Sequence, residues 1–402
     1  MKKLLLVKKT VITLLLILLT GWLLQYTWQK RSLSDKNQIL SDNDAKTMKF
    51  LPEAQYLLGL KALSDSDAAT ASTYFRQAVS QDVYHIDAWL KLAEAENALG
   101  NVEKAKKILQ FTHRRTKLVR RWKWSETLLA YELRIEKIFV HNINYMVQRG
   151  IHKQDALQLA DAYTDYKTAL TIQMLDTENL TPYLQNLMRL TRQADASLVW
   201  DAITATGKPA PDILLQYVNF LVNKKKIIKA YPIWREYTGT DGITNPDFEK
   251  KITRQGFDWR FGNDSERNWV IKRVTSPTYQ GEYALQVTFG GKKNISFHHL
   301  YQIVPVKPLA AYTLTFVWQS VNITTDQGPF IEIYGYDQTG LSVHSRQITG
   351  TDEWHTESIQ FKPPANCHAV VIRLRRMKSK RFDSKIAGVI RLDNFRLSRI
   401  VP

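Results

Sequence analysis

The stretch AGVIRLDNFRLSRI, residues 387–400, begins with the pattern of a β-strand and then breaks that pattern. Ile390 and Leu392 alternate with a charged residue, as expected for a strand with one buried face. After the pair Asp393-Asn394 the apolar positions shift by one residue. Such a shift turns every later side chain to the opposite face unless a β-bulge absorbs it. The sequence therefore predicts a final strand with a bulge at its acidic pair.

Similar alternation recurs through the C-terminal part of the chain, between turn-forming glycines and prolines. Short strands at this density predict an all-β antiparallel sandwich over residues 241–402. The predicted strands cover residues 283–289, 312–318, 330–336, 356–361, 369–374 and 389–392.

Five landmarks in this part of the chain follow one another in a distinctive order. They are NPDFE (245–249), SPTYQGEYALQV (276–287), YQIVPVKPLAAYTLTFVW (301–318), EWHTESIQFKPP (353–364) and IRLDNFRL (390–397). This series resembles the jelly rolls of carbohydrate-binding modules of the galactose-binding-like type. The resemblance implies a jelly-roll sandwich and, more weakly, glycan binding, because this fold serves many functions. It also implies that the last strand leaves the sandwich at its acidic pair.

Residues 50–240 have the pattern of an all-α domain, and two units in it repeat with a period of 34 residues. Ala71 and Phe75 of the first unit correspond to Ala105 and Leu109 of the second. These small and large apolar positions resemble the tetratricopeptide repeat, a helix pair that stacks into a solenoid. The chain departs from the repeat at Glu96, where the family usually has an aromatic residue.

The chain has 402 residues and a net charge of +18, with a pI near 9.7. This charge favours a polyanion or an anionic surface as partner. The single cysteine, Cys367, excludes an internal disulfide and a cysteine-based zinc cluster.

A basic N-terminus (1–9) precedes an uncharged run of 19 residues, TVITLLLILLTGWLLQYTW (10–28). As a helix this run would extend about 28 Å, close to the thickness of a hydrocarbon core. The lysines before it predict a signal anchor with a cytoplasmic N-terminus, and a cleaved signal peptide is the alternative. This topology predicts a flexible tether over residues 29–49 and a periplasmic location for the bulk of the chain, which would argue against nucleic acid as a partner.

Candidate glycan-binding residues are aromatic side chains in loop-rich segments, since flat rings can stack on the apolar faces of sugars. They are Trp259, Trp269, Tyr279 and Trp354. In a sandwich the alternative for each is a place in the core. The basic stretch RLRRMKSKR (373–381) adds Arg373, Arg375 and Arg376 as candidate contacts to acidic groups. The alternative is an ordinary solvated surface.

The family resemblance also implies a structural calcium ion at Asp393, with Asp247 and Glu249 as further ligands, since calcium prefers oxygen ligands. The alternative is a bulge whose Asp393 side chain accepts backbone N–H groups. No known catalytic motif is present. A glycan-cleaving enzyme would need a facing carboxylate pair such as Glu332 and Glu353, and we expect no catalysis.

An anchor, helical repeats and a jelly roll together resemble proteins of bacterial exopolysaccharide and O-antigen assembly. The resemblance implies a single-pass inner-membrane scaffold of a Gram-negative bacterium. Its repeats would dock a polymerase, ligase or export protein of the membrane, and its jelly roll would bind an acidic or neutral polysaccharide. The alternative is a scaffold for envelope assembly or secretion that binds proteins only.

Overall fold

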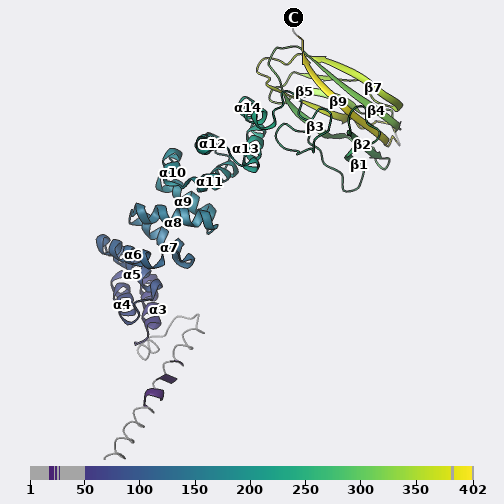
Figure 1. Cartoon of the computed structure of the whole chain (residues 1–402). Coiled ribbons are helices and arrows are strands. Elements are labelled where there is room, and N and C mark those ends of the chain that lie inside the picture. Colours follow the sequence, from purple (N-terminus) through teal and green to yellow (C-terminus); the bar gives the residue numbers. More distant parts are fainter. Residues whose placement is uncertain (1–17, 22, 25–26, 28–49, 382–383, 401–402) are drawn as a thin grey trace, which may run out of the picture. The chain divides into compact units, whose positions relative to one another are not determined.

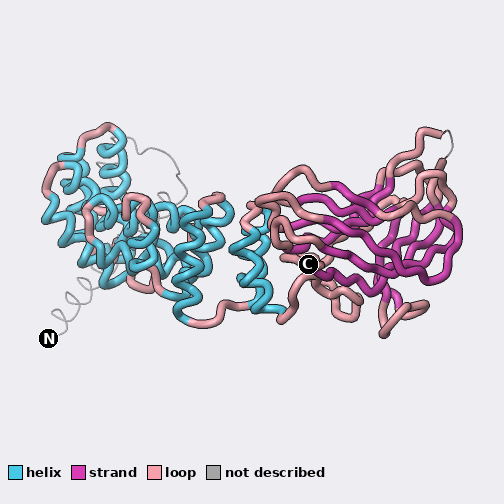
Figure 2. Tube along the Cα trace, turned by 90° about the horizontal axis from the view of Figure 1, so that it is seen from above, coloured by secondary structure: helices cyan, strands magenta, loops and turns pink. Residues whose placement is uncertain are grey.

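A computed structural model describes residues 18–21, 23–24, 27, 50–381 and 384–400 of the chain. Contacts between residues divide the chain into two units, one up to Lys208 and one from Pro209 onward, and each is described by itself. Figure 1 shows the helices of the first unit and the strands of the second, and Figure 2 distinguishes them by colour.

The predicted anchor (10–28) and tether (29–49) lie largely outside the described residues, so both stay predictions. Where the structure does describe the chain, none of its helices combines the length and the apolar character needed to cross a membrane.

The first unit consists of short helices joined by turns, and most of them pack on their neighbours along the chain. The α-helices are α3 (Pro52–Ser64), α4 (Ala68–Gln81), α5 (Ile86–Ala98), α6 (Val102–Thr116), α7 (Lys123–Glu132), α8 (Glu136–Arg149), α9 (Lys153–Tyr163), α10 (Thr168–Met174), α11 (Thr177–Arg189) and α12 (Gln193–Thr206). A 3₁₀ turn, η1 (Arg120–Trp122), precedes α7. The predicted helical region is therefore confirmed, while its assignment to the tetratricopeptide family stays a prediction.

The small residues of the repeat allow close packing between helices. A Cβ atom at Gly59 of α3 would lie 2.5 Å from the Phe75 ring of α4, which is far inside van der Waals contact. Phe75 is completely buried. A glycine in α3 therefore lets the large ring of α4 approach the α3 backbone.

Glu96 of α5 occupies the position that departs from the repeat pattern. Its side chain is buried and accepts several hydrogen bonds. Its carboxylate accepts hydrogen bonds from Ser72 and Arg76 of α4 and from Lys104 of α6, each at 2.7 Å. Asn101 donates to its second oxygen at 2.9 Å. Burial opposes ionisation of Glu96, but these hydrogen bonds and the Lys104 charge lower its pKa to about 2.

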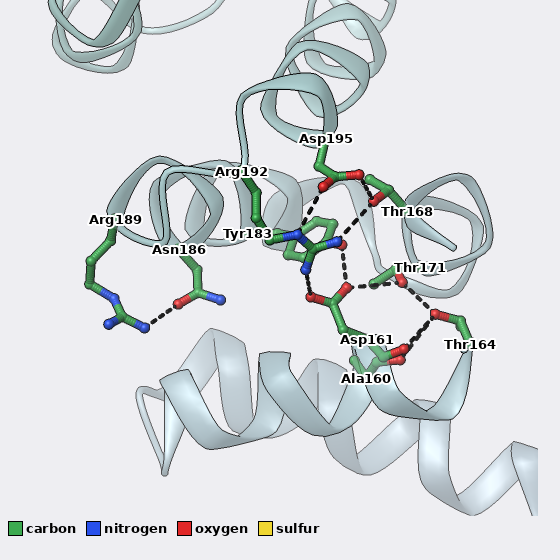
Figure 3. A network of polar contacts seen from close by, with 10 residues as sticks. All are labelled: Ala160, Asp161, Thr164, Thr168, Thr171, Tyr183, Asn186, Arg189, Arg192 and Asp195. Carbon is green, nitrogen blue, oxygen red and sulfur yellow. Dashed lines mark hydrogen bonds and ion pairs between the residues drawn. The ribbon is translucent and has the colours of Figure 1, made fainter. Parts of the chain in front are cut away.

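Two further carboxylates repeat this arrangement along the unit. Glu126 of α7 contacts His113 and Thr116 of α6 and Asn142 of α8. Asp161 of α9 accepts from Thr171 of α10, from Tyr183 of α11 and from Arg192 at the start of α12, as Figure 3 shows. Arg192 also donates to Asp195 at 2.8 Å. Each buried acid thus joins helices of successive pairs.

The second unit begins with the helices α13 (Pro211–Asn223) and α14 (Ile227–Thr238), which pack against the β-sandwich. The Trp234 indole N–H donates to Thr244 Oγ1 at 3.0 Å. The Trp234 ring lies so close to Gly256 that a Cβ there would be 2.3 Å from it. From the sandwich, Tyr336 donates its hydroxyl to the carbonyl of Val222 at 3.0 Å. These contacts hold the helix pair to one end of the sandwich.

Nine described strands form two antiparallel sheets around one apolar core. One sheet has the strand order β1-β2-β9-β4-β7, and the other has the order β3-β8-β5-β6. The strands are β1 (Trp269–Val274), β2 (Ala284–Gly290), β3 (Phe297–Pro305), β4 (Tyr312–Ile323), β5 (Phe330–Gly335), β6 (Ser342–His344), β7 (Gly350–Phe361), β8 (Ala369–Arg376) and β9 (Ala387–Arg399). The predicted antiparallel sandwich is confirmed.

The predicted bulge lies in β9 where the sequence indicates it. Asp393 pairs with Val317 of β4 and Arg396 pairs with Thr315, so two residues of β9 oppose a single residue of β4. Asn394 has a φ of 51°, in the left-handed region. The expectation that the last strand leaves the sandwich here is wrong, because β9 stays paired with β4 as far as Arg399.

Candidate glycan-binding surface

The five-stranded sheet has one face on the core and one face toward solvent. On β9, Ile390 and Leu392 belong to the core, so Arg391 between them points outward. The register places Gln286 of β2 on one side of Arg391 and Gln319 of β4 on the other. A row of three polar side chains therefore crosses the middle of the outer face.

Hydrogen bonds fix the geometry of this row. Arg391 donates from Nε to the Gln286 side-chain carbonyl at 3.0 Å and from Nη1 to that of Gln319 at 2.8 Å. The amide of Gln319 then donates to Glu353 of β7 at 3.3 Å. Partial burial lowers the pKa of the Arg391 guanidinium from its ordinary value, but arginine stays protonated in proteins. The row is a preorganised set of hydrogen-bonding groups.

Two aromatic side chains meet beside this row. Trp354 follows Glu353 on β7, and Tyr279 comes from the loop between β1 and β2. Their ring centroids are 5.9 Å apart, with the ring planes inclined by 59°. Tyr279 is 46% exposed and Trp354 is half-buried. Two of the four predicted aromatic residues are therefore brought together in contact with solvent.

Two carboxylates hold the loop that carries Tyr279. Asp393 is fully buried, and its Oδ2 accepts the backbone N–H groups of Tyr279 at 3.2 Å and Gln280 at 3.3 Å. Glu249 Oε1 accepts the N–H groups of Glu282 at 2.9 Å and Tyr283 at 3.0 Å. Burial raises the pKa of Asp393 from its ordinary value, and these N–H groups act in the opposite direction.

Asp393 and Glu249 therefore adopt the arrangement of the alternative interpretation, in which carboxylates accept backbone N–H groups. Asp247 is close enough to Asp393 for its charge to raise the pKa of that carboxyl further. Among the described residues, no group of three or more His, Cys, Asp or Glu side chains could hold a metal ion. The predicted calcium ion at Asp393 stays a prediction.

Trp259 contradicts its predicted role. The side chain is 1% exposed, packs on Phe248 and Phe395, and donates its indole N–H to the Asn245 carbonyl at 3.2 Å. It is a core residue, as the alternative interpretation of sandwich aromatics proposed. Phe248 of the NPDFE stretch is thus one of the residues that bury Trp259.

Trp269 lies at the start of β1 and is half-buried. Its ring stacks on that of His299, with centroids 4.3 Å apart and planes inclined by 9°. Its indole N–H donates to the Gly262 carbonyl at 2.9 Å. One face of the indole is therefore occupied by the protein itself, and the structure does not bring Trp269 into contact with the Tyr279–Trp354 pair.

The three predicted arginines separate into two environments. Arg373 and Arg375 lie on the outer face of the four-stranded sheet, where both pair with Glu332 at 2.6 and 3.1 Å. Arg376 contradicts its predicted role, because its side chain is fully buried and donates to Asn294, Thr325 and Ser384. The guanidinium of Arg376 fixes loops and is not available to a ligand.

The two carboxylates considered for glycan cleavage do not form a pair. Glu332 lies on β5 in the four-stranded sheet and is neutralised by arginines. Glu353 lies on β7 in the five-stranded sheet. Because they belong to different sheets, they do not face each other across one cleft.

No protein-family model and no curated protein matches the sequence. Solved structures similar to part of the chain include carbohydrate-binding modules. TmCBM61 in complex with β-1,4-galactotriose is 21% identical over 40% of this chain and 99% of its own, with a TM-score of 0.28. A family 16 carbohydrate-binding module is 19% identical over 39% of this chain and 98% of its own, with a TM-score of 0.26.

A Stig cyclase from Fischerella sp. TAU is similar to the same extent. It is 17% identical over 40% of this chain and 98% of its own, with a TM-score of 0.26. Binding modules and an enzyme thus appear side by side among the similar structures.

Proposed function

We propose that this protein is a non-catalytic scaffold whose β-sandwich binds glycan on the outer face of its five-stranded sheet. The main support for this proposal is the contact between Tyr279 and Trp354 beside the Gln286–Arg391–Gln319 row. Aromatic side chains supply apolar faces for stacking on sugar rings, and a few fixed polar groups select the hydroxyls. We name this set of five residues the platform.

The test is electrophoresis of the full chain, in mild detergent, through native gels that contain neutral or acidic polysaccharides. Retardation by at least one polysaccharide is expected, and Tyr279→Ala or Trp354→Ala should abolish it. Tyr166→Ala is the matched control, because this tyrosine is 66% exposed on the helical unit. Absence of retardation by any polysaccharide would favour the alternative function, a scaffold that binds proteins only.

The helical unit contributes the docking surface for a membrane protein of polysaccharide polymerisation, ligation or export. Support comes from a hollow of about 540 Å³ between α6 and α8. Its lining is basic on both helices and includes His113, Arg114, Lys117, Lys137 and His141. Such a lining suits an acidic segment of a partner.

Photo-crosslinking in cells can test this docking surface. A photoreactive amino acid in place of Lys137 should form a crosslink to a membrane protein of polysaccharide assembly. The same amino acid at Glu94 is the control, since Glu94 lines a different hollow with acidic residues. Equal crosslinking from both positions would contradict the assignment of the partner to the α6–α8 hollow.

The N-terminal run 10–28 anchors the chain in the inner membrane, with residues 1–9 in the cytoplasm and the residues after the run in the periplasm. The basic residues before the run and its uncharged length support this topology. Resistance of the membrane-bound protein to alkaline carbonate, together with protease access only from the periplasmic side, is the expected result. Release of the protein by carbonate would contradict the anchor.

A further inference from the structure

Within the described part of the chain, Arg391, on the outer face of the five-stranded sheet, has no neutralising carboxylate, unlike the arginines on the outer face of the other sheet. Arg373 and Arg375 share the carboxylate of Glu332. Arg391 instead donates to two uncharged glutamine side chains. Across residues 50–381 and 384–400, no carboxylate oxygen lies within 4.0 Å of an Arg391 nitrogen. The Arg391 charge is therefore held in place without being neutralised.

The two glutamines also decide which part of the guanidinium stays available. Nε and Nη1 of Arg391 are engaged, whereas Nη2 makes no hydrogen bond to a described residue. A free Nη2 edge on a fixed guanidinium is suited to a carboxylate, since hydrogen bonds between charged groups are stronger than neutral ones. Arg391 is thus oriented as a receptor for an anionic group.

Arg391 and the aromatic pair lie within reach of one ligand. The Tyr279 N–H bonds to Asp393, two residues along the same strand from Arg391. Trp354 stands on β7, two strands away from β9, which corresponds to about 10 Å. A short oligosaccharide can therefore contact the rings and the guanidinium together.

A second cation continues this surface along β9. Arg396 is exposed on the far side of the bulge and donates to the Asn394 side chain at 3.1 Å. It forms no ion pair with any described carboxylate. At about 3.3 Å per residue, Arg391 and Arg396 are at most about 16 Å apart along the strand. Two such cations suit a polymer that carries repeated negative charges.

We infer that the platform selects acidic polysaccharide, with Arg391 binding the carboxylate of a uronic acid residue while Tyr279 and Trp354 contact its ring. The inference rests on the proposed glycan-binding function and specifies its ligand class. A neutral glycan would leave the Arg391 charge partly desolvated and unpaired, which is unfavourable.

The test uses the full chain in native gels with polygalacturonate, alginate or hyaluronate, each beside a sample whose carboxylates have been methyl-esterified. Retardation by at least one acidic polymer is expected, with loss on esterification. Arg391→Gln should lower the apparent affinity at least tenfold, and Arg391→Lys should restore only part of it. Arg375→Gln removes the same charge from the other sheet and should have little effect.

The outcomes separate this inference from the function on which it rests. Retardation of the chain by neutral or esterified polymers, sensitive to Trp354→Ala but not to Arg391→Gln, would overturn the acidic specificity and leave glycan binding intact. Equal losses of affinity with Arg391→Gln and Arg375→Gln would show that binding depends only on the net charge of the chain. This result would also overturn the acidic specificity of the platform. Absence of binding to every polymer would overturn both. Circular dichroism of each variant checks that it is folded.

Discussion

The buried carboxylate of Asp393 accepts the backbone N–H of Tyr279 at 3.2 Å and so fixes one ring of the platform to the last strand of the chain. Asp393 occupies the bulge, where the extra residue of β9 changes the direction of the side chains. The acidic pair that interrupts the alternation of the last strand therefore positions a loop from the start of the sandwich.

Removal of this carboxylate should disturb both stability and binding. Asp393→Ala leaves the backbone N–H groups of Tyr279, Gln280 and Asn394 without their acceptor, at a cost of about 1–3 kcal/mol in the free energy of unfolding. Polysaccharide retardation should fall as strongly as with Tyr279→Ala, because the loop loses its anchor. Asp393→Asn keeps one side-chain acceptor and should lose less. Urea unfolding and native gels measure the two effects, and unchanged retardation of Asp393→Ala would contradict the positioning role.

Glu96 predicts a pH dependence for the helical unit. Its folded pKa of about 2 lies below the ordinary value of 4.5, so the unfolded chain binds its proton more readily. The stabilisation by Glu96 is complete above about pH 5 and is lost as the pH falls through 4.5 toward 2. Glu96→Gln should cost about 1–3 kcal/mol at pH 7. The difference from the wild type, measured by circular dichroism at 222 nm, should shrink steadily below pH 4.5; a constant difference would contradict the assigned contacts.

The network around Asp161 predicts a ranking of two substitutions. Arg192→Ala leaves the buried Asp161 charge without its cation, which costs about 3–5 kcal/mol. Tyr183→Phe removes one neutral donor and should cost about 1–2 kcal/mol. Urea unfolding of the helical unit measures both. A larger effect for Tyr183→Phe would show that the ion pair is not the dominant contact.

Calcium can be tested independently of glycan binding. A site with a dissociation constant of about 10 µM would add about 2.7 kcal/mol at 1 mM calcium, enough to raise the melting temperature by several degrees. We expect no such shift between 1 mM calcium and EDTA, because backbone N–H groups already occupy Asp393 and Glu249. A shift that disappears with Asp393→Asn would instead establish the predicted calcium site.

Local patterns in the sequence were sufficient to predict that the first half of the chain is helical and that the second half is a β-sandwich. They also predicted the bulge in β9. Alternation identifies β2, β4, β5, β7, β8 and β9, because each has apolar residues on its core face. It misses three strands. β6 has three residues and no buried side chain, and the alternation of β1 is weak. In β3 the alternation is interrupted by a register shift between Phe297 and Leu300 and by consecutive buried residues. The alternation of apolar and polar residues shows which face of a strand is buried. It does not show which strands lie beside it, because that depends on the fold of the whole domain.

The site residues show the same limit. Trp259 and Trp354 are indistinguishable by residue type, and only the packing of Phe248 and Phe395 on Trp259 decides that it is buried. Arg391 was missed as a binding residue because a single arginine in a strand is ordinary. The usable signal was its place between Ile390 and Leu392, which puts its side chain on the solvent face of a central strand.

The helix pairs cannot exchange places along the chain, because each of the buried acids Glu96, Glu126 and Asp161 depends on partners from a neighbouring pair. The partners of each acid come partly from the preceding or the following pair. A hairpin transplanted to another position, or deleted, would leave a buried carboxylate facing side chains that cannot donate to it. Unlike consensus repeats with interchangeable interfaces, these hairpins form a non-permutable array, so recombination within it should be tolerated far less than point substitution on its surface.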